Sequence, residues 1–95
     1  MTKLSTKQID AALKGLPQWS TTGEAIQRTM QFADFVSAMA FVNRIAQEAE
    51  GVQHHPDILI RYNKVTLTLS THDAGGLTKK DFDFARRSDE LVAGG

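Results

Sequence analysis

The side chains of this 95-residue chain that are best suited to acid–base chemistry are its three histidines, His54, His55 and His72. The ordinary pKa of a histidine lies near neutrality, so an imidazole can both donate and accept a proton at physiological pH. A single histidine is more often an ordinary surface residue than a catalytic one. All the histidines of this chain fall near one predicted hairpin, however, and this clustering favours a shared role in proton transfer.

Two carboxylates lie where they could support such chemistry. Glu50 is expected in the last turn of a helix, where the helix dipole disfavours a negative charge. It is therefore either an exposed residue at a frayed helix end or a carboxylate that orients His54 or shares its proton. Asp81 comes three residues after Thr78, and a carboxylate there stabilises the start of a helix by about 0.3–1 kcal/mol. A structural role is sufficient to explain Asp81.

Other kinds of site fit the sequence less well. Zinc bound by three histidines needs nitrogens that converge on one point. Adjacent residues in an extended segment, such as His54 and His55, point in opposite directions, so we expect no metal ion. The chain has no cysteine, which excludes disulfides, thiolate metal sites and cysteine nucleophiles. The Gly75-Gly76 pair lacks the Lys-Ser/Thr that follows in a phosphate-binding loop.

A predicted β-hairpin brings the histidines together. Alternating apolar residues indicate strands over Asp57–Tyr62 and Val65–Thr71, joined by an Asn63-Lys64 turn. The apolar pairs in this register are Ile58 with Leu69, Ile60 with Leu67, and Tyr62 with Val65. Extending the ladder places His55 opposite His72. A lysine is not the preferred residue for such a turn, so a slipped register is the alternative.

The remaining elements are helices and a second pair of strands. The first helix begins at a capping box formed by Ser5 and Gln8, and the last begins at Thr78 and runs to about Val92. The other expected elements are strands over Trp19–Thr22 and Ala25–Phe32, and a long helix that Asp34 caps, that runs through Glu50 and that Gly51 stops. The order α-β-β-α-β-β-α predicts one α+β domain over residues 1–95. We expect two layers, a four-stranded antiparallel sheet with three helices on one face.

The long helix carries more apolar surface than one sheet face requires, since a stripe of about 100° is enough for that purpose. We expect the surplus to form a contact between subunits. The apolar residues of this helix are Phe35, Val36, Ala38, Met39, Phe41, Val42, Ile45, Ala46 and Ala49.

Charge and hydropathy argue against nucleic-acid and membrane partners. Eleven Lys and Arg residues balance eleven Asp and Glu residues, so the net charge is zero with neutral histidines. No basic surface for direct nucleic-acid binding is expected. No segment approaches the roughly 18 apolar residues of a membrane span, and nothing near Met1 has the pattern of a signal peptide. We therefore expect a cytoplasmic protein without a membrane partner.

The spacing of the candidate residues resembles the signature of the pterin-4a-carbinolamine dehydratases. The signature residues, read along this chain, are Glu50, His54-His55-Pro56, Tyr62, His72 and Asp81. Further similarity lies in the segments Tyr62–Val65, Leu69–Asp73 and Gly75–Thr78, and in Leu16-Pro17 ahead of Trp19. The resemblance covers nearly the whole chain, and every signature position is occupied.

This resemblance implies a fold, an assembly and an activity. It implies antiparallel strands with helices on one face, and a homotetramer or homodimer built through the sheet edge and the long helix. The implied reaction is the dehydration of 4a-hydroxytetrahydrobiopterin, a pterin-4a-carbinolamine, to quinonoid dihydrobiopterin. That step recycles the pterin cofactor of aromatic amino acid hydroxylases. No cofactor is implied for the dehydration itself, because the ring nitrogen lone pair can expel the hydroxyl group.

The resemblance also implies roles for individual residues. His55 and His72 would transfer protons near the departing hydroxyl group, and His54 would serve the opposite side or a ring nitrogen. Glu50 would tune His54, and Asp81 would support the site. The pterin edge would bind the backbone of two segments, which comprise Gln53, His54, His55, Ser70, Thr71, His72 and Asp73.

A non-catalytic scaffold is the alternative. Members of this family also serve as a transcriptional coactivator in animals. A protein of that kind would keep the fold and use its interface without accelerating the dehydration.

Overall fold

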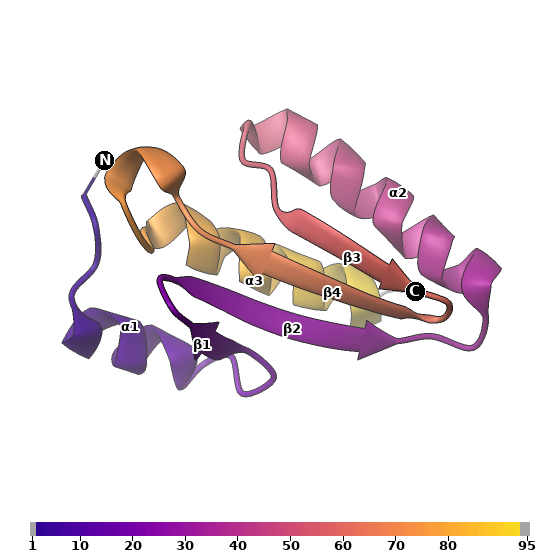
Figure 1. Cartoon of the computed structure of the whole chain (residues 1–95), viewed down its shortest axis with the longest axis horizontal. Coiled ribbons are helices and arrows are strands. Elements are labelled where there is room, and N and C mark those ends of the chain that lie inside the picture. The colour runs from indigo at the N-terminus through magenta and orange to yellow at the C-terminus, as the bar shows by residue number, and fades with distance from the viewer. Residues whose placement is uncertain (1, 94–95) are drawn as a thin grey trace.

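The structure, a computed structural model, describes residues 2–93. Helices and strands follow one another in the predicted order, with a short 3-10 helix added after the last strand. Their bounds are α1 Thr6–Leu13, β1 Ser20–Thr22, β2 Ala25–Gln31, α2 Phe35–Val52, β3 Asp57–Arg61, β4 Lys64–Leu69, η1 His72–Ala74 and α3 Lys79–Ala93. Figure 1 shows the sheet with α3 lying across its back. The predicted α+β class is confirmed.

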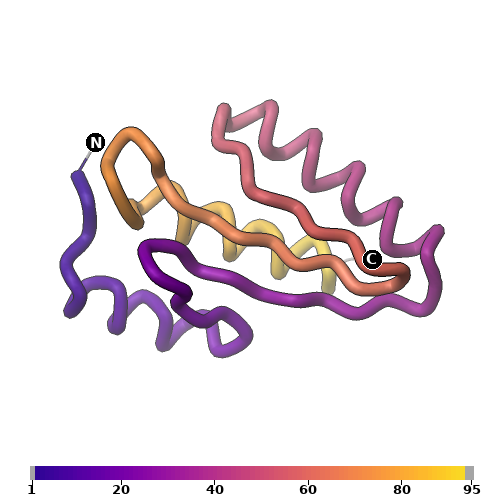
Figure 2. Tube along the Cα trace, viewed as in Figure 1, coloured from indigo at the N-terminus to yellow at the C-terminus, as the bar shows by residue number. Residues whose placement is uncertain are grey.

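The strands form one antiparallel sheet in the order β1-β2-β4-β3, so the last strand of the sequence lies inside the sheet (Figure 2). Alternate residues of a strand share a face. On the covered face the sheet contributes Ile26, Met30, Val65, Leu67 and Leu69, each at most 2% exposed. The opposite face is polar, and there the Thr29 and Thr66 hydroxyls lie 2.8 Å apart in a hydrogen bond.

The helices cover one face of the sheet, as predicted. Their apolar side chains belong to the same buried cluster as those of the strands. α2 contributes Ala38, Phe41, Ile45 and Ala49, α3 contributes Phe82, Phe84 and Ala85, and α1 packs against the margin through Ile9, Ala12 and Leu13.

The predicted caps at the starts of the first two helices are present. The Ser5 hydroxyl accepts from the Gln8 backbone N–H at 3.2 Å, and the Gln8 side chain accepts from the Ser5 N–H at 2.8 Å. The Asp34 carboxylate accepts from the Ser37 N–H at 2.8 Å. Each bond satisfies a backbone donor that the helix itself leaves free.

The β3–β4 hairpin has a different register from the predicted one. The observed pairs are Ile58 with Leu67, Ile60 with Val65, and Arg61 with Lys64. The turn is formed by Tyr62 and Asn63, and Tyr62 is left-handed, with a φ of 52°. Asn63 is held outside the ladder because its backbone carbonyl accepts from Phe32 N–H at 2.8 Å and its side-chain amide donates to Phe32 O at 2.9 Å. Each partner shifts by two residues, so the paired side chains of β3 and β4 keep their predicted faces. The predicted pairing of Tyr62 with Val65 is wrong, because Tyr62 lies in the turn and is 66% exposed.

α2 continues through Gly51, so the prediction that this glycine stops the helix is wrong. Glycine weakens a helix but does not by itself end one. The helix ends at Gln53, which is left-handed with a φ of 53°. The backbone N–H of His54 then donates to Ala49 O at 3.1 Å and closes the last turn.

The large apolar side chains of α2 that are exposed lie in its first turn and at its last residue. Phe41 is fully buried in the core, whereas Phe35, Val36 and Val52 are 46%, 77% and 53% exposed. A subunit contact through this helix stays a prediction. Within residues 2–93 the helices lack the combination of length and hydropathy that crossing a bilayer requires, and the cytoplasmic location also stays a prediction.

Candidate active site

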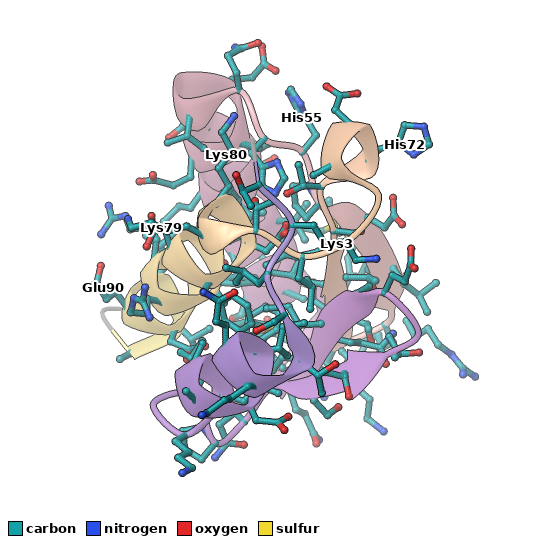
Figure 3. The ribbon with its side chains drawn as sticks, turned by 90° about the vertical axis from the view of Figure 1, so that its left-hand side faces the viewer. Lys3, His55, His72, Lys79, Lys80 and Glu90 are labelled. Carbon is teal, nitrogen blue, oxygen red and sulfur yellow. The ribbon has the colours of Figure 1, made fainter. Side chains whose placement is uncertain are left out.

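The antiparallel β3–β4 hairpin brings the candidate residues to one end of the sheet. His54 and His55 lie between the end of α2 and the start of β3, and His72 begins η1 just after β4. The start of β3 and the end of β4 meet because the strands are antiparallel. Figure 3 shows His55 and His72 projecting from this same end of the molecule.

His54 is buried against a buried carboxylate. Its Nε2 lies 2.6 Å from Asp81 Oδ1, and the two residues are 9% and 0% exposed. The second oxygen, Oδ2, accepts from the Thr71 hydroxyl at 2.8 Å and from the Thr78 backbone N–H at 2.9 Å. The Thr71 proton is thereby used, so the Thr78 hydroxyl, at 2.8 Å, donates to Thr71. Asp81 therefore joins the start of α3 to the end of β4 and to the segment after α2.

The carboxylate also determines which nitrogen of His54 carries a proton. An ionised carboxylate can only accept, so Nε2 is the donor in this pair. The other nitrogen, Nδ1, is then the position at which the ring can gain or lose a proton. The Phe84 ring meets the imidazole edge-on, with centroids 6.4 Å apart and planes at 69°. His54 is thus held in one orientation, with one nitrogen left for proton transfer.

Glu50 pairs with His55, so the predicted pairing with His54 is wrong. Glu50 Oε2 lies 2.5 Å from His55 Nε2, and these side chains are 72% and 57% exposed. The left-handed turn at Gln53 explains the difference, because it sends His54 into the core and leaves His55 beside the end of α2. The Gln53 side-chain amide donates to Glu50 O at 2.6 Å and ties this turn to the helix.

His72 is carried by a tight, closed loop. Thr71 N–H donates to Gly76 O at 3.0 Å, and Gly76 N–H returns a bond to Thr71 O at 3.3 Å. Gly75 is left-handed, with a φ of 74°, a conformation that favours glycine. The Lys3 side chain lies over Gly76 so closely that a Cβ there would be 2.8 Å from Lys3 Cε. Within residues 2–93 the His72 ring, unlike the other two imidazoles, has no hydrogen-bond partner.

Two adjoining hollows lie at this end of the sheet. The first, of about 260 Å³, is lined by Gln53, His54, His55, Ser70, Thr71, His72, Asp73 and Lys80. The second, of about 300 Å³, is lined by Ala25, His55, Asp57, Thr68, Ser70 and His72. They share the walls formed by His55, Ser70 and His72, and we call the two together the histidine groove. A larger hollow of about 560 Å³ at the hairpin tip contains none of these acid–base groups.

The first hollow brings together every residue that was predicted to contact substrate. The predicted supporting residues lie outside it: Asp81 is behind His54, and Glu50 is beside His55. The predicted position of His55 opposite His72 is wrong. The observed ladder, if extended, places Ser70 opposite His55. His55 and His72 are therefore common walls of the groove instead of a cross-strand pair.

Two charged residues of the groove were not predicted. Lys80 lies in the first turn of α3, and Asp57 is the first residue of β3. Lys80 is the neighbour of Asp81, which holds the start of α3 against His54. For Asp57 the sequence offered one usable signal, its position directly after His-His-Pro.

A metal centre has no support in the geometry of the described residues. In residues 2–93, no three His, Cys, Asp or Glu side chains are placed to hold one ion. The arrangement instead offers imidazoles in different settings around one groove, two of them paired with carboxylates. Such a groove is suited to donating a proton to one atom of a ligand and accepting a proton from another.

Comparison with known proteins identifies the family. Residues 2–91 match the family profile described as pterin 4 alpha carbinolamine dehydratase. The chain belongs to this family. A relative from Acidobacterium capsulatum is 52% identical over 97% of this chain and 100% of its own length. Another, from Nocardia farcinica, is 54% identical over 94% of each chain. Both carry the name pterin-4-alpha-carbinolamine dehydratase as a provisional one.

Solved structures of dehydratase-family proteins share the fold. A protein from Brucella melitensis, described as a transcriptional coactivator/pterin dehydratase, superimposes with a TM-score of 0.91 at 35% identity, over 95% of this chain and 98% of its own. A pterin dehydratase-like protein, described as a RuBisCO assembly factor in the alpha-carboxysome, gives a TM-score of 0.67 at 25% identity. That match covers 78% of this chain and 88% of the other. The family fold is thus found in proteins described by different functions.

Proposed function

We propose that this chain is a hydro-lyase that dehydrates 4a-hydroxytetrahydrobiopterin to quinonoid dihydrobiopterin and water. The observation that carries the proposal is the histidine groove, in which three imidazoles surround one space in a member of the dehydratase family. The geometry of the groove supports acid–base chemistry, and the family supports the choice of this reaction.

The reaction requires two proton transfers. The substrate has a hydroxyl group on a ring carbon, C4a, that is bonded to the ring nitrogen N5. A proton must reach the departing oxygen, and the proton on the nitrogen must be removed as the lone pair forms the new C=N bond. Each positioned acid or base contributes a factor of about 10²–10⁴ to such a step. The step needs no change in oxidation state, and water is the leaving group.

We assign the protonation of the hydroxyl group to His55 and His72. Both are common walls of the two hollows, so one departing group could be near both. We assign the removal of the nitrogen proton to His54, because Asp81 occupies its Nε2 and leaves Nδ1 to accept. Glu50 would hold His55 in position from the surface.

The flat edge of the pterin would be bound by backbone and small polar groups. The two segments proposed for this task, residues 53–55 and 70–73, form much of the wall of the first hollow. The protein would act as a homotetramer or homodimer and would supply recycled pterin to an aromatic amino acid hydroxylase.

A stopped-flow ultraviolet assay tests the activity. The 4a-hydroxypterin is generated chemically or by hydroxylase turnover, and its decay is followed with and without the protein. We expect the protein to accelerate the decay, and the acceleration to survive treatment with EDTA. No acceleration over the spontaneous reaction would overturn the proposal, and loss with EDTA that zinc restores would overturn the metal-free mechanism.

A non-catalytic scaffold is the second candidate. It is favoured by the solved structures described as a coactivator/pterin dehydratase and as a RuBisCO assembly factor, since both share this fold. The same assay separates the candidates, because a pure scaffold would leave the decay rate at its spontaneous value.

A further inference from the structure

Lys80 is the one lysine or arginine that lines either hollow of the histidine groove. The groove also contains the carboxylates of Asp57 and Asp73, and Asp81 lies just behind it. An ammonium group can only donate hydrogen bonds, so it is complementary to a ligand group that accepts them.

The other basic side chains of α3 are already paired. Lys79 donates to Asp83 at 2.7 Å, and this bond lowers the pKa of the Asp83 carboxyl. Arg86 also donates to Asp83, and Arg87 donates to Glu48. Each of the other three basic side chains of α3 is therefore paired with a carboxylate.

Lys80 differs from these neighbours. In the part of the chain that the structure describes, no carboxylate lies within ion-pair distance of its ammonium group. An unpaired ammonium at the mouth of a site can bind a ligand without first breaking an ion pair, and it keeps three donors for that purpose.

Lys80 also lies between the histidine groove and another hollow. Together with His54 it lines a further hollow of about 160 Å³ between α2 and α3, so the two residues separate that hollow from the groove. Figure 3 shows Lys80 reaching the end of the molecule that carries His55 and His72, with His72 on the far side of His55. A ring bound in the groove could therefore meet His55 and His72 at one atom and Lys80 at a neighbouring one.

We propose that Lys80 is a substrate-binding residue whose ammonium group donates a hydrogen bond to the oxo oxygen of the pterin ring. This proposal rests on the proposed function, because it places the pterin in the histidine groove. An ammonium has donors only, so it requires an acceptor, and the oxo oxygen is the strongest acceptor of the ring. The carbon that bears this oxygen is bonded to C4a, the carbon that loses the hydroxyl group. A residue beside the histidines can therefore reach it and select pterins over rings that carry a donor at that position.

Binding of two stable ligands tests this assignment without any turnover. One ligand is 6-methylpterin, and the other is 2,4-diamino-6-methylpteridine, in which an amino donor replaces the oxo acceptor. Their Kd values are measured by fluorescence titration for the wild type, for Lys80→Met and for Lys79→Met. The Lys79 variant is the matched control, since it removes the same charge one residue away, from a side chain that lines neither hollow of the groove. Circular dichroism checks that each variant is folded.

We expect Lys80→Met to weaken 6-methylpterin binding about tenfold, the effect of losing one hydrogen bond to a charged donor. We expect Lys79→Met to change it less than about twofold, as for a distant exposed charge. The wild type should prefer 6-methylpterin over the diamino analogue, and Lys80→Met should lose that preference. If the wild type binds pterin and Lys80→Met keeps both the affinity and the preference, the assignment of Lys80 is wrong while the proposed function stands. If the wild type binds neither ligand, the proposed pterin site itself is wrong.

Discussion

Asp81 and His54 are 27 residues apart in the sequence, yet their side chains form a buried hydrogen bond of 2.6 Å. The same carboxylate accepts from the backbone at the start of α3, so one side chain both caps a helix and orients a histidine. The helix-capping interpretation of Asp81 is therefore confirmed, and its supporting role in the site stays a prediction. Glu50 and His55 repeat the carboxylate–histidine pair at the surface, where water surrounds it.

The two carboxylates should differ sharply in their effect on stability. Asp81→Ala leaves the His54 Nε2–H, the Thr71 hydroxyl and the Thr78 N–H without their acceptor inside the protein. We expect it to lower the free energy of unfolding by about 3–5 kcal/mol. Glu50→Ala breaks a pair that is mostly exposed, and we expect a change within about 0.5 kcal/mol. Urea unfolding followed by circular dichroism measures both.

Asp81→Ala and Glu50→Ala could instead lose equal free energies of unfolding. That result would contradict the prediction, because burial would then not distinguish the two carboxylate–histidine pairs. Asp81→Asn serves as a further control, because it keeps an acceptor for the Thr78 N–H and should lose less stability than Asp81→Ala.

The histidines should divide into two groups in double-variant kinetics. If His55 and His72 serve one departing hydroxyl group, each single Ala variant should lower turnover by about 10–10³, within the range of one general acid. Removing both should cost little more than the worse single change, because groups that act as a unit are not additive. His54→Ala combined with His72→Ala should cost nearly the product of the singles, since they act on different atoms.

Turnover of the three single and two double variants, each checked for folding, decides this division. Multiplicative loss in the His55/His72 pair would reject their shared task. Full activity in all three singles would reject the histidine groove as the active site.

The start of α2 should contribute to assembly. Val36 is 77% exposed and its neighbour Phe35 is 46% exposed, whereas Phe41 on the same helix is fully buried. We expect the wild type to sediment as an oligomer at micromolar concentration, and Val36→Asp to shift it toward smaller species while its circular dichroism stays unchanged. Phe41→Asp should instead unfold the chain, because an unpaired charge in the core costs several kcal/mol. A monomeric wild type would refute the predicted subunit contact.

The cap of α2 should make stability depend on pH in a known direction. The Ser37 N–H bonded to the Asp34 carboxylate lowers the pKa of that carboxyl below its ordinary value. A carboxyl whose pKa is lower in the folded than in the unfolded state stabilises the fold above the unfolded pKa, which is near 4, and loses this effect as the pH falls through the folded pKa. Asp34→Ala should therefore have a lower Tm than the wild type at pH 7. The difference between the two Tm values should become smaller below about pH 4.

Asn at the same position provides the control for this pH effect. Asp34→Asn keeps a side-chain acceptor for Ser37 but does not titrate, so its Tm should differ from that of Asp34→Ala by the same amount at every pH. The contrary outcome is a Tm difference between the wild type and Asp34→Ala that stays constant down to the lowest pH at which both proteins fold. It would show that Asp34 does not act through its charge.

The hairpin shows which part of the fold could be predicted from the sequence. Alternation of apolar residues assigned each side chain of β3 and β4 to the correct face, because a shift by two residues leaves faces unchanged. Because a two-residue shift leaves the faces unchanged, the alternation of apolar residues cannot determine the register. The turn is held instead by two hydrogen bonds between Asn63 and Phe32. Phe32 lies in the loop between β2 and α2, and no local sequence pattern connects it to the hairpin.

The candidate site, too, could be predicted from the sequence only in part. The grouping of His54, His55 and His72 follows from local strand patterns and an antiparallel hairpin, and it could be predicted. Their carboxylate partners could not, because the pairing of Glu50 depends on the left-handed conformation of Gln53. Glutamine gives no sequence signal for that conformation, in contrast to glycine.

The interior position of β4 has a consequence for the protein as it is synthesised. β4 is the last strand to be made, yet it carries Val65, Leu67 and Leu69, all fully buried, and it is the neighbour of both β2 and β3. Until it emerges from the ribosome, β2 has only the three residues of β1 to pair with, and the apolar face of α2 has no complete sheet to cover. The nascent chain therefore keeps core-forming side chains exposed until β4 has emerged, and the four-stranded sheet cannot form before that point.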